Sequence, residues 1–327
     1  MLQMLNSFLT VQAICTVAAL GVADLLTDGP RSVDEIAGST GTEAPALYRL
    51  LRLLAGVEVF REEPDGRFAM TPLAATLCSE GPGSVRDWAL YVGAREMWEV
   101  WGDLRETVTT GEAAFPRTHH LPLWQYLAGH PDLGMPFNRW MSRQSDQHNS
   151  SIVASYDFSA FRVVADIGGG QGSTLAAILS ANPSPRGILL DLPQVVAHTG
   201  PLQEAGVADR VQVIGGDMLE RVPAGADAYL VKRVLMDWGD QQAAAILRNC
   251  ADGLADGGKV LVVEMVIPPG NEPHPGKSFD ILMMVIHPDA RVRTEAEFAE
   301  IFKAAGLRLT RVIPTGLPNS ILEGVRG

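Results

Sequence analysis

The pattern of hydrophobic and polar positions changes near residue 160. Before this point, apolar residues recur at helical spacing, as in the stripe of Leu47, Leu50, Leu51 and Leu54 that stops at Gly56. After it, short runs rich in Val, Ile and Leu alternate with helical stretches. The runs expected to form strands are RVVADIG (162–168), RGILLDL (186–192), RVQVIGGD (210–217), DAYLVKRVL (227–235) and KVLVVEMVI (259–267). This alternation predicts a mostly parallel sheet with helices on both faces.

Two domains are therefore expected. Residues 1–150 are predicted to form a helical domain, and residues 151–327 an α/β domain whose last segment adds one helix and two antiparallel strands. In the first domain, Ser32 and Glu35 have the spacing of a capping box. The turn EPDG (63–66) lies between two short apolar runs and predicts a hairpin. Helix, helix and hairpin in this order are typical of a winged helix.

A winged helix makes DNA binding an alternative, which the charge of this unit opposes. Its second helix offers Arg49 and Arg52, but a helix that reads DNA needs a positive surface around it. The acidic residues of the unit are Asp34, Glu35, Glu43, Glu58, Glu62, Glu63 and Asp65. We therefore expect the winged unit to serve dimerisation, and a DNA-binding regulator is the disfavoured alternative.

The composition narrows the class of protein. With 46% hydrophobic and 20% charged residues, the 327-residue chain is ordinary for a soluble globular protein. Its formal charge of -12 argues against a nucleic acid as partner. Cys15, Cys78 and Cys250 give neither a disulfide framework nor a metal-ligand spacing, which fits the reducing cytoplasm. The adjacent pair His119 and His120 lacks the i, i+4 spacing of helical metal ligands, so we expect no metal site.

The N-terminal stretch MLQMLNSFLTVQAICTVAALGVADLL (1–26) has no charged side chain before Asp24. It lacks the basic region of a signal peptide, and polar residues interrupt its apolar run. These are Gln3, Asn6, Ser7, Thr10 and Gln12. We expect an amphipathic helix that buries one face against the partner subunit of a homodimer, and no membrane span.

The most informative motif is ADIGGGQGSTLAAIL (165–179), in which glycines follow a strand and open a helix. Such a turn brings the backbone close to a ligand, and a dinucleotide site is the obvious alternative. However, Asp166 precedes the first glycine, and a carboxylate there suits a cationic ammonium better than a pyrophosphate. Asp191 ends the next strand, where a ribose diol would bind, and GGDM (215–218) ends the third. In this order, the elements indicate an S-adenosylmethionine site.

With these motifs the whole chain resembles the small-molecule O-methyltransferases of the plant caffeic-acid type and their bacterial antibiotic-tailoring relatives. The segments that carry the resemblance are DIGGGQG (166–172), DLPQVV (191–196), GDML (216–219), YLVKRVL and DW (229–238) and PGKSFDILMM (275–284). The resemblance implies a class I methyltransferase fold, with a Rossmann-like sheet and an N-terminal winged-helix dimerisation domain. It also implies S-adenosyl-L-methionine as cofactor.

By this resemblance, cofactor contacts fall at the ends of four strands. Asp166, Gly168 and Gly170 would line the methionine end, and Asp191 would hold the ribose. Trp238 would stack on the adenine, with core packing as the alternative. The other expected contacts are Leu192, Gly216, Asp217, Met218 and Lys232, and loop capping is the alternative for Asp217.

The sequence differs from the family pattern at the position of the catalytic base. The family usually has Leu-His-Asp-Trp at residues 235–238, and its histidine removes the proton from a phenol. Met236 occupies that position here, and a thioether accepts no proton at neutral pH. Of the two acids that orient the histidine in the family, Glu264 matches one, whereas Val292 replaces the other. The candidate catalytic set is Met236, Asp237, Glu264 and His287.

Loss of the base leaves methyl transfer feasible. A general base contributes about 10²–10⁴-fold, whereas alignment of reactants reaches effective molarities of about 10⁵–10⁸ M. His287 and His148 are candidate replacement bases, with an ordinary structural hydrogen bond as the alternative for each.

The acceptor would lie between the last helices of the N-terminal domain and the carboxyl edge of the sheet. The expected contacts are Phe137, Trp140, Met141, His148, Asp280, Met283, Met284 and His287, with core packing as the alternative for Phe137. Such a wall indicates a flat, apolar acceptor. We therefore predict an S-adenosylmethionine-dependent methyltransferase of a small aromatic or polyketide-like metabolite. The alternative is a relative that keeps the cofactor for cyclisation, decarboxylation or hydroxylation.

Overall fold

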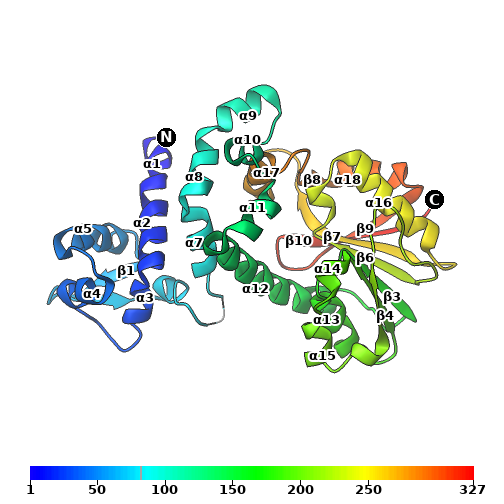
Figure 1. The fold of residues 1–327 in the computed structure, drawn as a ribbon, viewed down its shortest axis with the longest axis horizontal. Coiled ribbons are helices and arrows are strands. Elements are labelled where there is room, and N and C mark those ends of the chain that lie inside the picture. The colour runs from blue at the N-terminus through cyan, green and yellow to red at the C-terminus, as the bar shows by residue number, and fades with distance from the viewer. Residues whose placement is uncertain (82) are drawn as a thin grey trace. The chain divides into compact units, whose positions relative to one another are not determined.

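The computed structural model describes residues 1–81 and 83–327. The chain forms two compact units: the first comprises residues 1–106 and 114–143, and the second comprises residues 107–113 and 144–327. Figure 1 shows that the first unit is mainly helical and that the second is built on a sheet.

The start of the first unit has the expected winged-helix order. Its elements are α1 (Leu2–Leu5), α2 (Ser7–Leu20), α3 (Val22–Leu25), α4 (Val33–Thr40), α5 (Ala44–Ala55), β1 (Phe60–Glu62) and β2 (Phe68–Met70). The capping box of α4 is confirmed, because the side chains of Ser32 and Glu35 each accept a hydrogen bond from the other's backbone N–H. The hairpin is confirmed as well, since β1 and β2 pair antiparallel.

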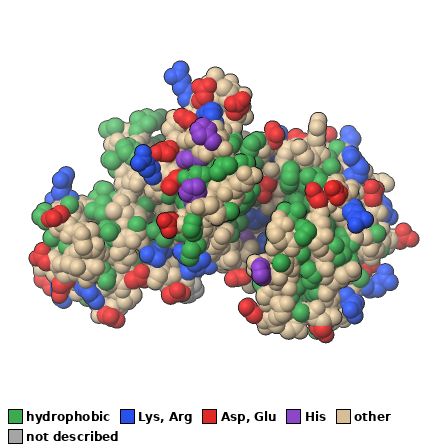
Figure 2. All heavy atoms as spheres, in the orientation of Figure 1, with side chains coloured by type: hydrophobic (Ala, Val, Ile, Leu, Met, Phe, Trp, Pro, Cys, Tyr) green, Lys and Arg blue, Asp and Glu red, His purple; other side chains and the backbone are tan. Residues whose placement is uncertain are grey.

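Apolar side chains are exposed along α1 and the start of α2. This N-terminal apolar patch consists of Met1, Leu2, Met4, Leu5, Phe8, Leu9 and Val11, and Figure 2 shows apolar side chains gathered at this end of the unit. Residues 2–20 are also long and apolar enough to cross a membrane by length and composition, as no other helix in the described residues is. Only 22% of this segment is buried. Its apolar surface is therefore available for association.

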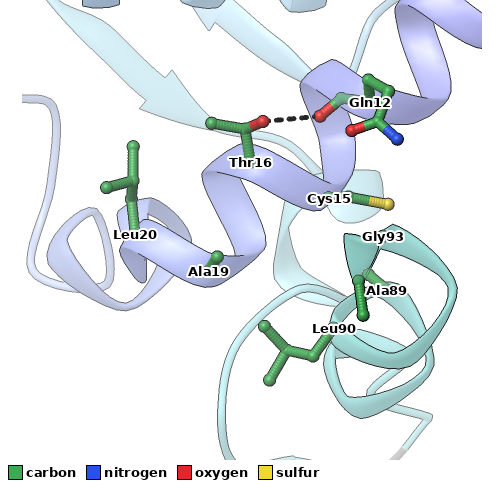
Figure 3. Close-up of a pocket in the computed structure, with 9 residues that line it drawn as sticks. Gln12, Cys15, Thr16, Ala19, Leu20, Ala89, Leu90 and Gly93 are labelled. Carbon is green, nitrogen blue, oxygen red and sulfur yellow. Dashed lines mark hydrogen bonds between the residues drawn. The ribbon is translucent and has the colours of Figure 1, made fainter. Parts of the chain in front are cut away.

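A pocket of about 310 Å³ lies between α2 and α7 (Arg86–Gly93). Figure 3 shows Cys15 of α2 close to Gly93 at the end of α7. A Cβ atom at Gly93 would lie 2.4 Å from the Cβ of Cys15, so the close approach of these helices requires glycine at this position.

Further helices complete the first unit and lead into the second. They are α6 (Pro72–Ala75), α8 (Arg95–Gly102), α9 (Leu104–Thr110), α10 (Ala114–His119), α11 (Leu123–Gly129) and α12 (Pro131–Ser155). Asp87 of α7 is buried and accepts hydrogen bonds from Arg139 of α12, with a shortest N–O distance of 2.7 Å. This ion pair fixes the first half of α12 to the helical unit.

The second unit is built on an eight-stranded sheet in the order β5-β4-β3-β6-β7-β10-β9, with β8 paired to β7. The strands are β3 (Val163–Ile167), β4 (Arg186–Asp191), β5 (Val211–Gly215), β6 (Ala228–Lys232), β7 (Lys259–Ile267), β8 (Arg293–Thr294), β9 (Leu307–Pro314) and β10 (Asn319–Arg326). Strands β3 to β7 are parallel, and β9 and β10 are antiparallel, as predicted. The strand order reverses beside β3, and open α/β sheets bind ligands at such a switch point.

Helices cover both faces of this sheet (Figure 1). On one face, α16 (Asp240–Gly253) and α18 (Glu295–Ala304) share a buried cluster with Ala165 and Ile167 of β3. On the other, α13 (Ser173–Ala181), α15 (Gly200–Glu204) and the end of α12 share a cluster with Val164. Burial on both faces explains the continuous apolar run of β3. The remaining elements are α14 (Pro193–Val196), α17 (Pro275–Ile286) and the 3₁₀ helices η1 (Ala208–Arg210) and η2 (Leu235–Asp237).

Candidate active site

The glycine turn after β3 passes close to the ends of two strands. Gly168 and Gly170 have φ angles of 67° and 60°, in the left-handed region that favours glycine. A Cβ atom at Gly168 would lie 2.7 Å from a methyl group of Val234, and one at Gly169 would lie 2.5 Å from the carboxyl carbon of Asp166. A side chain would therefore obstruct the backbone path at Gly168 and Gly169, whereas at Gly170 the positive φ angle is what favours glycine.

Asp166 ends β3 beneath this turn and is 1% exposed. Neither carboxylate oxygen has a hydrogen-bond partner of good geometry among the described residues. Burial raises the pKa of Asp166, and the positive charge of Lys232 opposes this rise. The backbone N–H of Leu175 also lowers the pKa, but its effect is the smallest. A buried carboxylate that lacks partners is unfavourable. The position is suited to a ligand group that carries positive charge and donates hydrogen bonds.

Lys232 ends the neighbouring strand β6. Its Nζ donates hydrogen bonds to Asn149 Oδ1 (2.9 Å), Thr174 Oγ1 (3.0 Å) and Ser145 Oγ (3.2 Å). These acceptors are neutral, and Ser145 and Asn149 lie on one face of α12 because they are four residues apart. Burial lowers the pKa of Lys232, and the negative charge of Asp166 opposes this change. The three N–H donors of Lys232 are thus all in use, so Lys232 can act on an anionic group of a ligand through its positive charge.

Asp191 connects the turns after β3, β4 and β5. Its Oδ2 accepts a hydrogen bond from the backbone N–H of Gly170 (2.8 Å), and its Oδ1 accepts one from Leu192 (2.7 Å). The backbone N–H of Gly216 donates to the carbonyl oxygen of Asp191 at 3.0 Å. Each carboxylate oxygen retains a further lone pair, so a ribose hydroxyl can still donate to Asp191.

Asp217 and Trp238 make the contacts that their alternative interpretations, loop capping and core packing, predict. Asp217 Oδ1 accepts a hydrogen bond from the backbone N–H of Leu219 at 2.8 Å, which caps its own loop. Met218 and Trp238 are partly buried against the cluster of the sheet face that α16 covers. Their contacts with an adenine ring remain predictions.

The turn that contains Met236 is anchored on three sides. The backbone N–H of Met236 donates to Glu264 Oε1 at 3.3 Å, and its carbonyl oxygen accepts from the backbone N–H of Arg291 at 2.9 Å. Arg293, which is fully buried, donates to the carbonyl oxygens of Leu235 (2.8 Å) and Trp238 (2.7 Å). The turn is therefore held through backbone groups, which do not depend on the side chain at residue 236.

Residues 236, 264 and 292, the three positions of the family's catalytic group, lie close together. Glu264 bonds to Met236, and Val292 lies between two residues that bond to the same turn. Val292 is 5% exposed, and its backbone N–H donates to Asp280 Oδ1 at 2.7 Å. The structure thus brings residues 236, 264 and 292 to one place, with methionine and valine where the family usually has histidine and an acid.

Several ionisable groups adjoin this turn. Burial raises the pKa of Glu264 to about 8 and that of Asp237 to about 6, and the positive charge of Arg233 opposes both shifts. Burial lowers the pKa of His148 to about 4, and the charges of Arg233 and Lys232 add to this decrease. At neutral pH, Glu264 is mostly protonated, His148 is neutral and Asp237 is mostly ionised.

The predicted acceptor contacts fall in both units. In the helical unit, Trp140 stacks on Trp88 at 5.5 Å between ring centroids, and Phe137 is buried beside Tyr91 at 5.0 Å. Phe137 thus packs in the core of the helical unit, as its alternative interpretation predicts, and its contact with an acceptor remains a prediction. Met141 is partly exposed on the same helix.

In the second unit, the predicted acceptor contact His148 is buried on α12, and the other predicted contacts lie on or just after α17. Met283 and His287 are buried, whereas Asp280 and Met284 are partly exposed. Burial lowers the pKa of His287. The described residues contain no group of three His, Cys, Asp or Glu side chains arranged to hold a metal ion.

Sequence reasoning missed four residues that shape the site. They are Ser145, Asn149 and Thr174, which bond to Lys232, and Arg293, which anchors the turn at residue 236. The i, i+4 spacing of Ser145 and Asn149 was the available signal for a shared face. Nothing local to the sequence marks Arg293 as buried.

The comparisons with known proteins agree with this geometry. The family model of the O-methyltransferase domain matches residues 101–308, and that of the O-methyltransferase dimerisation domain matches residues 2–80. The phenazine O-methyltransferase PhzM of Lysobacter antibioticus is 43% identical over 324 residues, which cover 99% of this chain and 94% of that enzyme. The chain belongs to the O-methyltransferase family.

Solved structures of methyltransferases match nearly the full length of this O-methyltransferase. CalO1, a methyltransferase in calicheamicin biosynthesis in its S-adenosylhomocysteine-bound form, matches with a TM-score of 0.89 and 37% identity over 99% of this chain and 96% of that chain. NcsB1 from neocarzinostatin biosynthesis, in complex with S-adenosylmethionine and 2-hydroxy-5-methyl naphthoic acid, matches with a TM-score of 0.83 and 32% identity over 97% and 96%. The class I methyltransferase fold and the S-adenosylmethionine cofactor predicted from the sequence are confirmed.

We expect the Asp166→Asn substitution to weaken binding of S-adenosylmethionine by about 10- to 100-fold, because it removes a charge-assisted hydrogen bond to the ammonium group. Wild-type affinity should rise with pH through the neutral range. The reason is that burial raises the pKa of the free carboxyl, and the bound ammonium requires its ionised form. The variant should lose this pH dependence.

Isothermal titration calorimetry between pH 6 and pH 8, with the exposed Asp256→Asn variant as a matched control, measures both effects. Equal affinities of wild type and Asp166→Asn at every pH would contradict the assignment of Asp166.

Proposed function

We propose that this enzyme transfers the methyl group of S-adenosylmethionine to a hydroxyl group of a small aromatic or polyketide-like metabolite, without a histidine base at residue 236. The observation that carries the proposal is a pair of opposite charges near the ends of β3 and β6, the buried Asp166 and the partly buried Lys232. A ligand with both an ammonium and a carboxylate complements this pair. The relatives support the acceptor class, since one is named for a phenazine and another was solved with a naphthoic acid.

The cofactor contacts follow from the same charges. Asp166 would accept hydrogen bonds from the ammonium, Lys232 would bind the carboxylate, and Asp191 would accept from the ribose. The proposed contacts of the rest of the nucleoside are Leu192, Gly216, Asp217, Met218 and Trp238. When bound, the cofactor supplies a methyl group on a positively charged sulfur. The division into a lid and dimerisation domain (1–150) and a cofactor domain (151–327) belongs to this proposal, as do the acceptor contacts predicted from the sequence.

Met236 would act as an apolar wall beside the acceptor. A methionine side chain adapts to flat rings but takes up no proton. Glu264 is mostly protonated at neutral pH, so it would not take the place of the base either. Alignment of the acceptor oxygen with the methyl carbon then supplies most of the rate enhancement.

Radiolabelled S-adenosylmethionine tests the function directly. The enzyme is incubated with the labelled donor and a panel of hydroxylated phenazines, naphthoic acids and aromatic polyketides, and with amine analogues as a control for the accepting atom. We expect label in the O-methylated product of at least one acceptor. Turnover that changes the acceptor's mass or ring pattern without moving label would instead favour a cyclase, decarboxylase or hydroxylase.

We expect the Met236→His substitution to raise kcat for phenols of ordinary pKa about 10-fold, because it restores a proton acceptor next to Glu264. This gain in kcat should be smaller than that of a histidine with two acids, because Glu264 is present but Val292 replaces the second acid. Adding Val292→Glu should increase it further. Methyl transfer to a series of phenols measures these effects, with Met236→Leu as the control. An unchanged rate in Met236→His would mean that residue 236 does not face the acceptor.

A homodimer is part of the proposal, because the dimerisation domain contains the N-terminal apolar patch. We expect the double substitution Leu5→Glu and Leu9→Glu to shift the protein from dimer to monomer, since charged side chains oppose burial of the patch. Light scattering after size-exclusion chromatography measures the mass. Val108→Glu is the control, because Val108 is at least as exposed as Leu5 and Leu9 but lies outside the patch. A dimer that survives the double substitution would contradict this interface.

The expected partners and location complete the proposal. A small-molecule acceptor is the partner, with neither nucleic acid nor membrane, and the location is cytoplasmic. Cys15, Cys78 and Cys250 are all free and buried thiols, which supports a reducing compartment.

A further inference from the structure

Asp237 follows Met236 directly on η2 and has a carboxylate that the fold leaves available. Its side chain is partly exposed and accepts no hydrogen bond within the described part of the chain. Its neighbour Glu264, in contrast, is 2% exposed and bonds to the turn itself. A carboxylate that neither caps the backbone nor forms an ion pair is unusual in a half-buried turn. The carboxylate oxygens of Asp237 can therefore accept a hydrogen bond from a ligand that binds beside the turn.

The turn holds the backbone of Asp237 in a fixed place. Arg293 bonds to the carbonyl oxygens on either side of it, at Leu235 and Trp238, and Arg291 bonds to that of Met236. Val234, at the start of the same turn, closes over the cofactor loop, because a methyl of Val234 fills the space next to Gly168. The turn that carries Asp237 is thus fixed to the loop proposed to hold the cofactor.

We propose that Asp237 is the general base that replaces the missing histidine. This proposal rests on the proposed function. The acceptor oxygen forms its bond to the methyl carbon while the carbon–sulfur bond breaks, and the electron pair of that bond stays on sulfur. The hydroxyl proton of the acceptor passes to a carboxylate oxygen of Asp237. Because Asp237 is partly exposed, the proton then leaves to water.

The charged groups around the turn favour Asp237 over its neighbours. Arg233 and Glu264 act on Asp237 through their charges, Arg293 acts on Glu264, and His148 lies near Arg233. At neutral pH, Glu264 already carries a proton, and His148, with a pKa near 4, is a weaker base. The pKa of Asp237, about 6, keeps it ionised at neutral pH while it remains basic enough to take a proton.

Arg233 sets this balance as a positioning residue. Its backbone has a φ of 53°, which is rare for a residue with a side chain, and its guanidinium lies 5.6 Å from the ring centroid of Phe279. This conformation keeps a positive charge near both Asp237 and Glu264, and that charge lowers the pKa of each. Without it, burial alone would keep Asp237 protonated nearer neutral pH.

The test compares Asp237→Asn with wild type on two phenols, one with a pKa near 10 and one nitrated phenol with a pKa near 7. We expect Asp237→Asn to lower kcat about 100-fold or more for the less acidic phenol and much less for the nitrated one, which ionises without help. Wild-type kcat should rise with pH around a midpoint near 6, and the variant should lose this midpoint. Asp237→Glu should recover part of the activity because it retains a carboxylate.

Calorimetric affinity for S-adenosylhomocysteine shows that each variant is folded, and Asp256→Asn is the control for loss of an exposed carboxylate. An equal loss on both phenols, or a midpoint that persists in Asp237→Asn, would overturn the role of Asp237. Either result would leave the methyltransferase function in place. A wild-type enzyme that binds the cofactor but moves no label to any acceptor would remove both proposals.

Discussion

Two opposite charges, the buried Asp166 and the partly buried Lys232, lie at the ends of neighbouring parallel strands and constrain the rest of this site. Asp166 pairs in register with Leu230 of β6, which places Lys232 just beyond it. Removing either charge from water is expensive, and the fold compensates only in part. Lys232 has three neutral acceptors, whereas the oxygens of Asp166 lack well-placed donors among the described residues. The remaining compensation for Asp166 can come from a ligand that carries a positive charge and donates hydrogen bonds.

The cofactor loop follows from this constraint. A ligand can approach Asp166 only if the backbone above it carries no side chains, and the space next to Gly168 and Gly169 is already filled by Val234 and Asp166. The helix α12 supplies Ser145 and Asn149 to Lys232, so the cofactor end of the sheet depends on a helix that begins in the other unit. The charges of Asp166 and Lys232 thus involve both the glycine turn after β3 and the helix α12.

The sequence predicted the sheet and the loop because both depend on local pattern. The apolar run of β3 and the glycines after it can be recognised without tertiary information. The contacts of Arg293 cannot, because a buried arginine is identified only by the carbonyl oxygens that surround it, and those belong to a turn almost sixty residues earlier. The same holds for the place of Val292 beside Met236, which depends on the two-residue strand β8. The resemblance identified these positions, but only the structure shows that they still lie together.

The substitution at residue 236 changes the chemistry of the turn and leaves its shape intact. The turn is fixed by backbone bonds to Glu264, Arg291 and Arg293, so the side chain at residue 236 was never what held it. A histidine could therefore be lost without disturbing the cofactor loop, at a cost of about 10²–10⁴-fold in rate for weakly acidic acceptors. For acceptors whose hydroxyl is already acidic, a carboxylate of moderate basicity is sufficient. With Asp237 in the proposed role of base, we therefore expect this active site to favour acidic phenols, because its preserved elements align the reactants and its altered ones lower only the strength of the base.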